Sequence, residues 1–311
     1  MLQPVDLNQI ERKGITLKTL ENQLDHFRQG FPFIRLLRPA TQGDGIINFS
    51  EEQKKEFIRF FEENAPSLRL IKFVPASGAA SRMFKHLFEF RESLKADSGI
   101  PESYFSDTSF NSVNYFFHNI HRFAFYHDLQ SSLMKEGKLL ERALAENDFA
   151  LILDHLLGKV GLNYAALPKA LLAFHSYEDG PRAAIEEHLV EAANYTRDQN
   201  DVSRIHFTVS PEHIGKFDEM ATALRDKYET RFHTHLDIHR SIQKSSTDTI
   251  AVDEENQPFR NPDGTLFFRP AGHGALLANL NELDADVIFI KNIDNIVPDR
   301  LKTPTIENKK L

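Results

Sequence analysis

The stretch at residues 71–85 constrains the fold of this chain more than any other. It begins with an apolar run at residues 71–74, which is typical of a buried strand, and it resumes with Met83, Phe84 and Leu87 at helical spacing. A strand that turns sharply into a helix leaves backbone N–H groups unpaired at the positive end of the helix dipole. The stretch therefore predicts an anion site, although an ordinary tight turn explains these residues equally well.

The corner between the two elements is made of small residues. Gly78 has no Cβ that would keep a phosphate at a distance, and Arg82 adds a planar, fork-shaped cation. A solvated arginine on an ordinary helix face is the alternative for Arg82. The corner is not a Walker loop, because a second glycine followed by Lys and Ser or Thr is missing. The backbone N–H groups that we expect to face the anion belong to Ser77, Gly78, Ala79, Ala80 and Ser81.

Composition argues against several classes of function. A net charge of −8 over 311 residues disfavours general nucleic-acid binding, which needs a basic surface. With no cysteine, the chain has no disulfide framework, no thiolate zinc site and no cysteine nucleophile. The first residues lack the pattern of a signal peptide, and no apolar run of about 18 residues predicts a membrane span. We therefore expect a cytoplasmic protein that binds neither nucleic acid nor membrane.

Periodicity divides the chain into three predicted regions. Residues 1–69 form an N-terminal helical region, with a capping box that begins at Ser50. Residues 95–159 are also helical and rich in phenylalanine, and we interpret them as an insertion. Residues 70–94 and 160–311 alternate between strand and helix patterns, which favours a parallel α/β sheet.

The α/β region carries further signals. Pro181 fits the first position of a helix, and we expect that helix to turn its apolar stripe inward and Glu186 and Glu187 outward. Strands are predicted at residues 204–209 and along the stretch 286–296, whose apolar run ends in polar residues.

Polar or small residues follow several of these elements. The last predicted strand leads into Asp294 and Asn295, and ligands gather at such carboxyl ends in open α/β sheets. A second corner, Gly272-His273-Gly274, opens a short helix. Simple strand termination is the alternative for Asp294, and backbone geometry alone is the alternative for the two glycines.

Residues 231–243 alternate as in a strand. One face would carry His233, His235, Asp237 and His239, a set that could bind a metal. We favour a solvated polar face.

Four features in a fixed order carry a resemblance: the corner at Gly78, Pro168-Lys169, Gly272-His273-Gly274 and Asp294-Asn295. Their order resembles that in the sugar-1-phosphate nucleotidyltransferases (nucleotide-sugar pyrophosphorylases). The last two features are most similar to the uridine-diphosphate-sugar branch of that superfamily. Over its full length the chain more closely resembles a bacterial family, domain of unknown function 4301, through residues 243–252 and the final strand.

The resemblance implies a Rossmann-like nucleotidyltransferase fold of the GT-A type. In such a fold a mixed, mainly parallel sheet is flanked by helices, here with an N-terminal helical region and a helical insertion. Ala80 stands where the superfamily usually has Gly, Ser81 stands where it usually has Thr, and no second metal-binding acid follows Asp294. We therefore expect either a site that is completed elsewhere or a fragment of a longer protein.

The resemblance also implies a reaction in which a nucleoside triphosphate and a sugar 1-phosphate give a nucleotide-sugar and pyrophosphate. Residues 77–81 would hold the triphosphate, Arg82 would offset charge on the departing pyrophosphate, and Lys169 would hold the sugar phosphate. Asp294 would bind Mg²⁺. Further nucleotide contacts would come from Gln243, Gly272, His273, Gly274 and Asn295.

Other hypotheses remain open at this point. A non-catalytic nucleotide or nucleotide-sugar binding protein on the same fold is favoured by Ala80 and by the missing second acid. A partner-binding protein is suggested by the phenylalanine-rich helices. Lys169 is alternatively a surface lysine after a turn proline, and for Gln243 we favour no part in base recognition.

Overall fold

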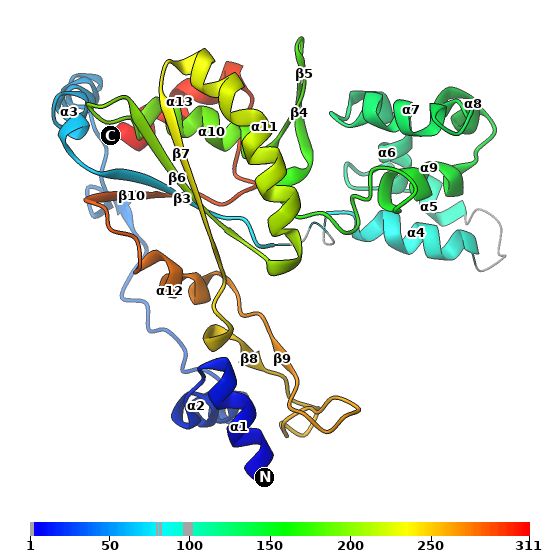
Figure 1. Cartoon of the computed structure of the whole chain (residues 1–311), viewed down its shortest axis with the longest axis horizontal. Coiled ribbons are helices and arrows are strands. Elements are labelled where there is room, and N and C mark those ends of the chain that lie inside the picture. Colours follow the sequence, from blue (N-terminus) through cyan, green and yellow to red (C-terminus); the bar gives the residue numbers. More distant parts are fainter. Residues whose placement is uncertain (1–2, 79, 81–82, 96–101) are drawn as a thin grey trace.

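The computed structural model describes residues 3–78, 80, 83–95 and 102–311 (Figure 1). Its centre is a sheet of four parallel strands in the order β10-β3-β6-β7. The bounds of these strands are Leu70–Pro75 for β3, Val202–Val209 for β6, His235–Ile242 for β7 and Val287–Ile290 for β10. The chain is therefore mixed α/β with a mainly parallel central sheet flanked by helices, as its alternating pattern predicts.

The strands of this sheet bury apolar side chains such as Val74, Ile205 and Phe207 against helices. Three long helices lie over one face in Figure 1: α10 (Ala184–Tyr195), α11 (Ile214–Phe232) and α13 (Lys302–Lys310). The short helix α12 (Leu277–Leu280) is tied to the edge strand β7, where the Asn279 side-chain amide donates to Ser241 Oγ at 2.9 Å and to the Ile242 carbonyl at 2.8 Å. Strand β3, the first of these four strands in the sequence, lies between β10 and β6 and is buried along its length.

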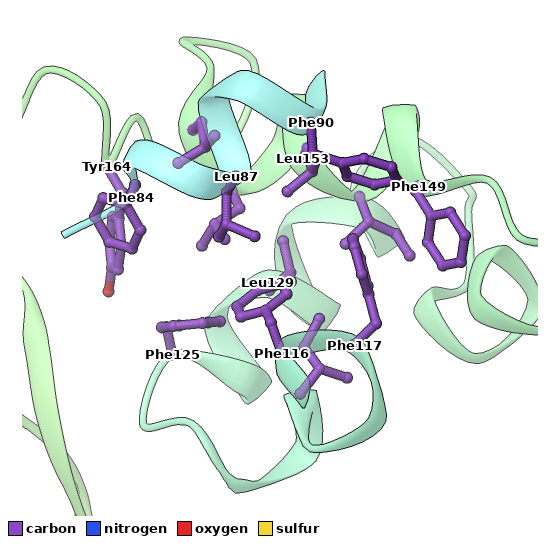
Figure 2. Close-up of a cluster of buried hydrophobic side chains, with 14 of the residues drawn as sticks. Phe84, Leu87, Phe90, Phe116, Phe117, Phe125, Leu129, Phe149, Leu153 and Tyr164 are labelled. Carbon is purple, nitrogen blue, oxygen red and sulfur yellow. The ribbon is translucent and has the colours of Figure 1, made fainter. Parts of the chain in front are cut away.

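A separate hydrophobic cluster holds the helices between β3 and β4 together (Figure 2). Phe90 is fully buried at its centre, with the rings of Phe117 and Phe149 within about 6 Å of it. Helix α4, which we expected to belong to the α/β domain, contributes Leu87 and Phe90 to this cluster instead, because its apolar side faces the other helices. The helices of this unit are α4 (Lys85–Lys95), α5 (Glu102–Ser106), α6 (Val113–His118), α7 (Tyr126–Met134), α8 (Leu140–Ala145) and α9 (Phe149–Leu157).

The N-terminal helices pack against a segment that is more than 200 residues away in sequence. Buried Asp6 accepts two hydrogen bonds from the Arg260 guanidinium, at 2.8 and 2.7 Å. The elements that meet here are α1 (Pro4–Lys13), α2 (Leu17–Gln29), β8 (Thr249–Ile250) and β9 (Phe268–Arg269). Helix α3 (Glu51–Asn64) begins at the predicted capping box, where Ser50 and Gln53 bond to each other's backbone N–H groups.

An extended arm joins α2 to the following short strands. The arm, residues 31–37, leaves its large apolar side chains in solvent, and Phe33 is 99% exposed. Beyond it lie β1 (Thr41–Gln42) and β2 (Gly45–Ile46). Since these side chains are already in contact with water, substitutions in the arm are expected to leave the free energy of unfolding nearly unchanged.

Three predicted details differ from the structure. Pro181 lies in a β-hairpin made of β4 (Ala173–Tyr177) and β5 (Gly180–Ala183), and α10 starts only afterwards, at Ala184. Glu186 and Glu187 are buried, because cationic and hydroxyl partners from other elements receive them. The predicted strand at residues 231–243 is shorter at its start, because α11 extends to Phe232.

Single turns of 3-10 helix connect several elements. They are η1 (Ala65–Ser67), η3 (Ile120–Arg122), η4 (Lys169–Leu171), η5 (Pro211–His213), η6 (Ser245–Thr247), η7 (His273–Leu276) and η8 (Asp299–Leu301). In the part of the chain that the structure describes, no helix combines the length and the apolar character needed to cross a membrane.

A buried histidine on β6 is expected to make stability depend on pH. Burial, assisted by His239, lowers the pKa of His206 from 6.5 to about 4. The folded protein therefore binds this proton less readily than the unfolded chain, so stability is full above pH 6.5 and is lost as pH falls toward 4. The shift corresponds to about 3 kcal/mol. Urea unfolding measures the free energy of unfolding at pH 7 and at pH 4. Its decrease between the two should be larger by this amount in the natural protein than in a His206→Gln variant. Equal decreases would show that His206 is not the group responsible.

Candidate functional site

The corner after β3 lies at the carboxyl edge of the central sheet, next to β6. The Ala76 N–H donates to the Thr208 carbonyl at 3.0 Å and so closes the pairing of the two strands. For the N–H groups of Ser77 and Gly78, the structure gives no acceptor among the described residues. Ala80 is fully buried and anchors the far side of the corner. The proposed anion-binding residues Ala79, Ser81 and Arg82 lie outside the described residues.

An ion pair joins two of the predicted site residues across 125 positions of sequence. Lys169 Nζ lies 2.6 Å from the Asp294 carboxylate, and the two side chains are 21% and 43% exposed. The Lys169 backbone N–H also makes a long hydrogen bond, 3.4 Å, to the Gly78 carbonyl. The hydrogen bond from Lys169 holds the pKa of Asp294 below its usual value, and the charge of His273 acts in the same direction. The fold therefore brings Gly78, Lys169 and Asp294 together.

At three glycines near this edge, nothing among the described residues requires glycine. None of Gly78, Gly272 and Gly274 has a positive φ, so each could carry a side chain without backbone strain. A Cβ built at any of them would meet no described atom within 4 Å. The alternative that Gly272 and Gly274 serve backbone geometry thus loses its support. What remains is space that a ligand could occupy close to the backbone.

Of the other predicted nucleotide contacts, Gln243 makes a side-chain hydrogen bond within the protein, whereas His273 and Asn295 are exposed. The Gln243 side chain follows β7 and donates its amide to the Ala271 carbonyl at 3.0 Å, so it holds the loop before Gly272. This bond uses one of the two N–H groups of the side-chain amide. Asn295 is exposed directly after Asp294, and its backbone N–H closes a turn on the Asn292 carbonyl. His273 begins η7 and is exposed.

Beneath the site, α10 carries a buried cluster of charges that the sequence pattern did not reveal. Glu191 is fully buried and receives Lys72 at 2.8 Å and Lys291 at 2.7 Å. Burial opposes ionisation of Glu191, but the two lysines outweigh it and lower its pKa. Burial lowers the pKa of Lys72 to about 7. The cluster therefore holds two lysines on one carboxylate.

Helix α10 also contacts the segment after β10 that leads to Asp294. His188 Nε2 donates to the Ile293 carbonyl at 3.1 Å, and the imidazole is fully buried. Burial, with the nearby charge of Lys72, lowers the pKa of His188 well below 6.5 and keeps it neutral. His188 is thus a positioning residue for the backbone directly before Asp294. Its signal in the sequence was a histidine among glutamates on a helix that otherwise reads as amphipathic.

One family model matches nearly the whole chain. The model described as Domain of unknown function (DUF4301) matches residues 3–311. The chain belongs to this family. The resemblance carried by residues 243–252 and the final strand is confirmed to that extent. No curated protein and no solved structure matches the chain. The likeness of this DUF4301 member to the sugar-1-phosphate nucleotidyltransferases stays a prediction.

The site residues of this DUF4301 protein fit magnesium in one way only. Within the described ranges, no group of three or more His, Asp or Glu side chains is placed to hold a metal ion. A single carboxylate, Asp294, suits Mg²⁺ when substrate phosphates and water supply the other oxygens. A metal that is delivered with a nucleotide is therefore compatible with the residues present, provided that Lys169 gives way or turns to the phosphate.

The histidines at residues 233–239 do not converge. His233 lies at the end of α11 in the left-handed conformation, outside the strand. His235 lies 2.9 Å from Glu229, and His239 lies 2.8 Å from Asp237. The side chains of both strand histidines are more than half exposed. This arrangement is that of a solvated polar face.

Proposed function

We propose that the protein is a nucleotidyltransferase that forms a nucleotide-sugar from a nucleoside triphosphate and a sugar 1-phosphate, on a Rossmann-like fold of the GT-A type. The observation that carries the proposal is the ion pair of Lys169 with Asp294 beside the open corner at Gly78. Carboxyl ends of parallel strands are where ligands bind in open α/β sheets. A cation, a carboxylate and accessible backbone N–H groups are the parts that phosphoryl chemistry needs.

The chain's own groups would act mainly by positioning and by charge. Backbone N–H groups at Ser77 and Gly78 would donate to the triphosphate, and Arg82 would offset charge on the departing pyrophosphate. Lys169 would leave Asp294 and bind the sugar phosphate, whose oxygen attacks the α-phosphorus in line. Mg²⁺ held by Asp294 would supply charge neutralisation on the phosphates.

The proposal is tested by pyrophosphate release. The full-length protein would be incubated with Mg²⁺ and each pair from a panel of nucleoside triphosphates and sugar 1-phosphates. Turnover is expected for at least one pair, and Lys169→Ala, Asp294→Asn and Arg82→Ala are each expected to reduce it by about 100-fold or more. The Lys169–Asp294 pair is partly exposed, so the first two variants should lose less than about 1 kcal/mol of stability. Folded protein with no turnover on the whole panel would contradict the proposal.

A non-catalytic nucleotide or nucleotide-sugar binding protein is the second candidate. The observation that favours it is again the ion pair, because Lys169 neutralises the one carboxylate that we assign to the metal. Under this reading, nucleotide raises the melting temperature but no pyrophosphate forms. No shift with any nucleotide would remove both candidates.

A separate prediction concerns the corner glycine. Gly78→Ala is expected to leave the free energy of unfolding within about 0.5 kcal/mol of the natural value, since its Cβ would meet no described atom within 4 Å. Nucleotide affinity should nevertheless fall by about tenfold or more, because the Cβ would stand where phosphate approaches the backbone. Isothermal titration and urea unfolding measure the two quantities. Gly215→Ala is the matched control, because that glycine is equally open but lies in α11; equal affinities in the two variants would argue against phosphate binding at Gly78.

A further inference from the structure

A cavity of about 550 Å³ opens between the helical unit and strand β4. Its walls are largely aromatic: Phe84, Phe125 and Tyr164 lie together at one end of the cluster drawn in Figure 2, and Phe123 and Phe174 continue the lining. Buried aromatic rings normally pack against one another or against aliphatic side chains. Three of these rings do so, with the Phe84–Tyr164 and Phe125–Tyr164 centroids 6.0 and 5.7 Å apart, and the space beside them has the volume of small-molecule sites, roughly 300–1,000 Å³.

The cavity also contains a cation that no described carboxylate neutralises. Arg122 lines the space and is exposed, and its guanidinium donates to the Asn119 side-chain oxygen at 3.3 Å. No ion pair of Arg122 with an acid occurs in the described ranges. Other arginines of the helical unit, such as Arg142, do have an acidic partner. A guanidinium at an aromatic cavity favours an anion whose body is apolar.

We propose that this cavity binds a small aromatic anion, with its ring system between the phenylalanine and tyrosine side chains and its carboxylate or sulfonate on Arg122. The ring body matches the apolar walls, and the acidic group matches the single unpaired guanidinium among the described residues of the lining. The proposal does not depend on nucleotidyl transfer, because neither Lys169 nor Asp294 lines the cavity.

The probe is 8-anilinonaphthalene-1-sulfonate, an aromatic sulfonate whose fluorescence rises on binding. The full-length protein is expected to bind one equivalent saturably. Arg122→Gln, a change at an exposed side chain, should weaken binding by about tenfold through loss of a charge-assisted hydrogen bond. Ala124→Trp, which places an indole in the cavity, should abolish it. Circular dichroism confirms that each variant is folded.

The arm offers a matched control, since exposed apolar side chains also attract this dye. The double variant Phe33→Ser, Leu37→Ser removes two of the most exposed of them and should retain the saturable binding. The proposal is overturned if the natural protein shows no saturable binding, if folded Arg122→Gln binds as tightly as the natural protein, or if binding disappears in the arm variant but persists in Ala124→Trp.

Discussion

Glu191→Gln is expected to destabilise the protein by about 4 kcal/mol, because it leaves two buried lysines without a counter-charge. The carboxylate is fully buried and receives Lys72, Lys291 and the Tyr195 hydroxyl at 2.8, 2.7 and 3.1 Å. A glutamine side chain has one acceptor oxygen, and its NH₂ group would point at a donor. Urea unfolding at pH 7 measures the loss.

Two further variants separate this explanation from simple sensitivity of the core. Lys72→Met removes the surplus cation and leaves the Glu191–Lys291 pair balanced, so it should cost less than half as much. Glu63→Gln on the exposed surface of α3, where the carboxylate lies 3.8 Å from Arg59, should cost less than about 1 kcal/mol. If Lys72→Met were as damaging as Glu191→Gln, the charge-balance explanation would be wrong.

Gly161→Ala is expected to destabilise the helical unit by about 3 kcal/mol through overpacking. After α9, the chain folds back over the last turn of the helix, and the Leu162 N–H donates to the His155 carbonyl at 2.7 Å. A Cβ at Gly161 would lie 1.9 Å from that same carbonyl oxygen. The backbone must move for any side chain to fit. The change in melting temperature and in the urea midpoint measures this effect.

The control for Gly161 is again a glycine in open space. Gly215→Ala in the first turn of α11 should be neutral or should stabilise the protein by up to about 1 kcal/mol, since alanine is the better helix former. If Gly161→Ala melted at the same temperature as Gly215→Ala, the prediction would be wrong, because the folded-back segment would then have room to relax.

The order of elements could be predicted from local pattern. Residues 71–74, apolar apart from Lys72, lie within β3, the capping box at Ser50 starts α3, and the predicted stretch at 286–296 contains β10. These signals are local because strand and helix periodicities repeat within a few residues. The pattern failed on α10, where Glu186 and Glu187 appear polar enough to face solvent but are buried.

The candidate site was proposed residue by residue. Gly78 and Asp294 were proposed from their own sequence surroundings and Lys169 from the family resemblance; the fold places all three at one edge of the sheet, and their roles stay predictions. That Lys169 and Asp294 neutralise each other could not be read from positions 125 residues apart. The bond from Gln243 to the Ala271 carbonyl was equally invisible in the pattern.

The sequence by itself determined the central strands β3, β6 and β10, the start of α3, the small residues that follow β3 and membership of the DUF4301 family. Tertiary structure alone decided which charges are buried and which partner each one meets. The physical reason is that the energy of an ion depends on the polarity around it and on the distance to its counter-ion, and both are properties of three-dimensional position. Lys72, Glu191 and Lys291 come from three distant parts of the chain, and only the packing of α10 on β3 and β10 brings them into one buried cluster.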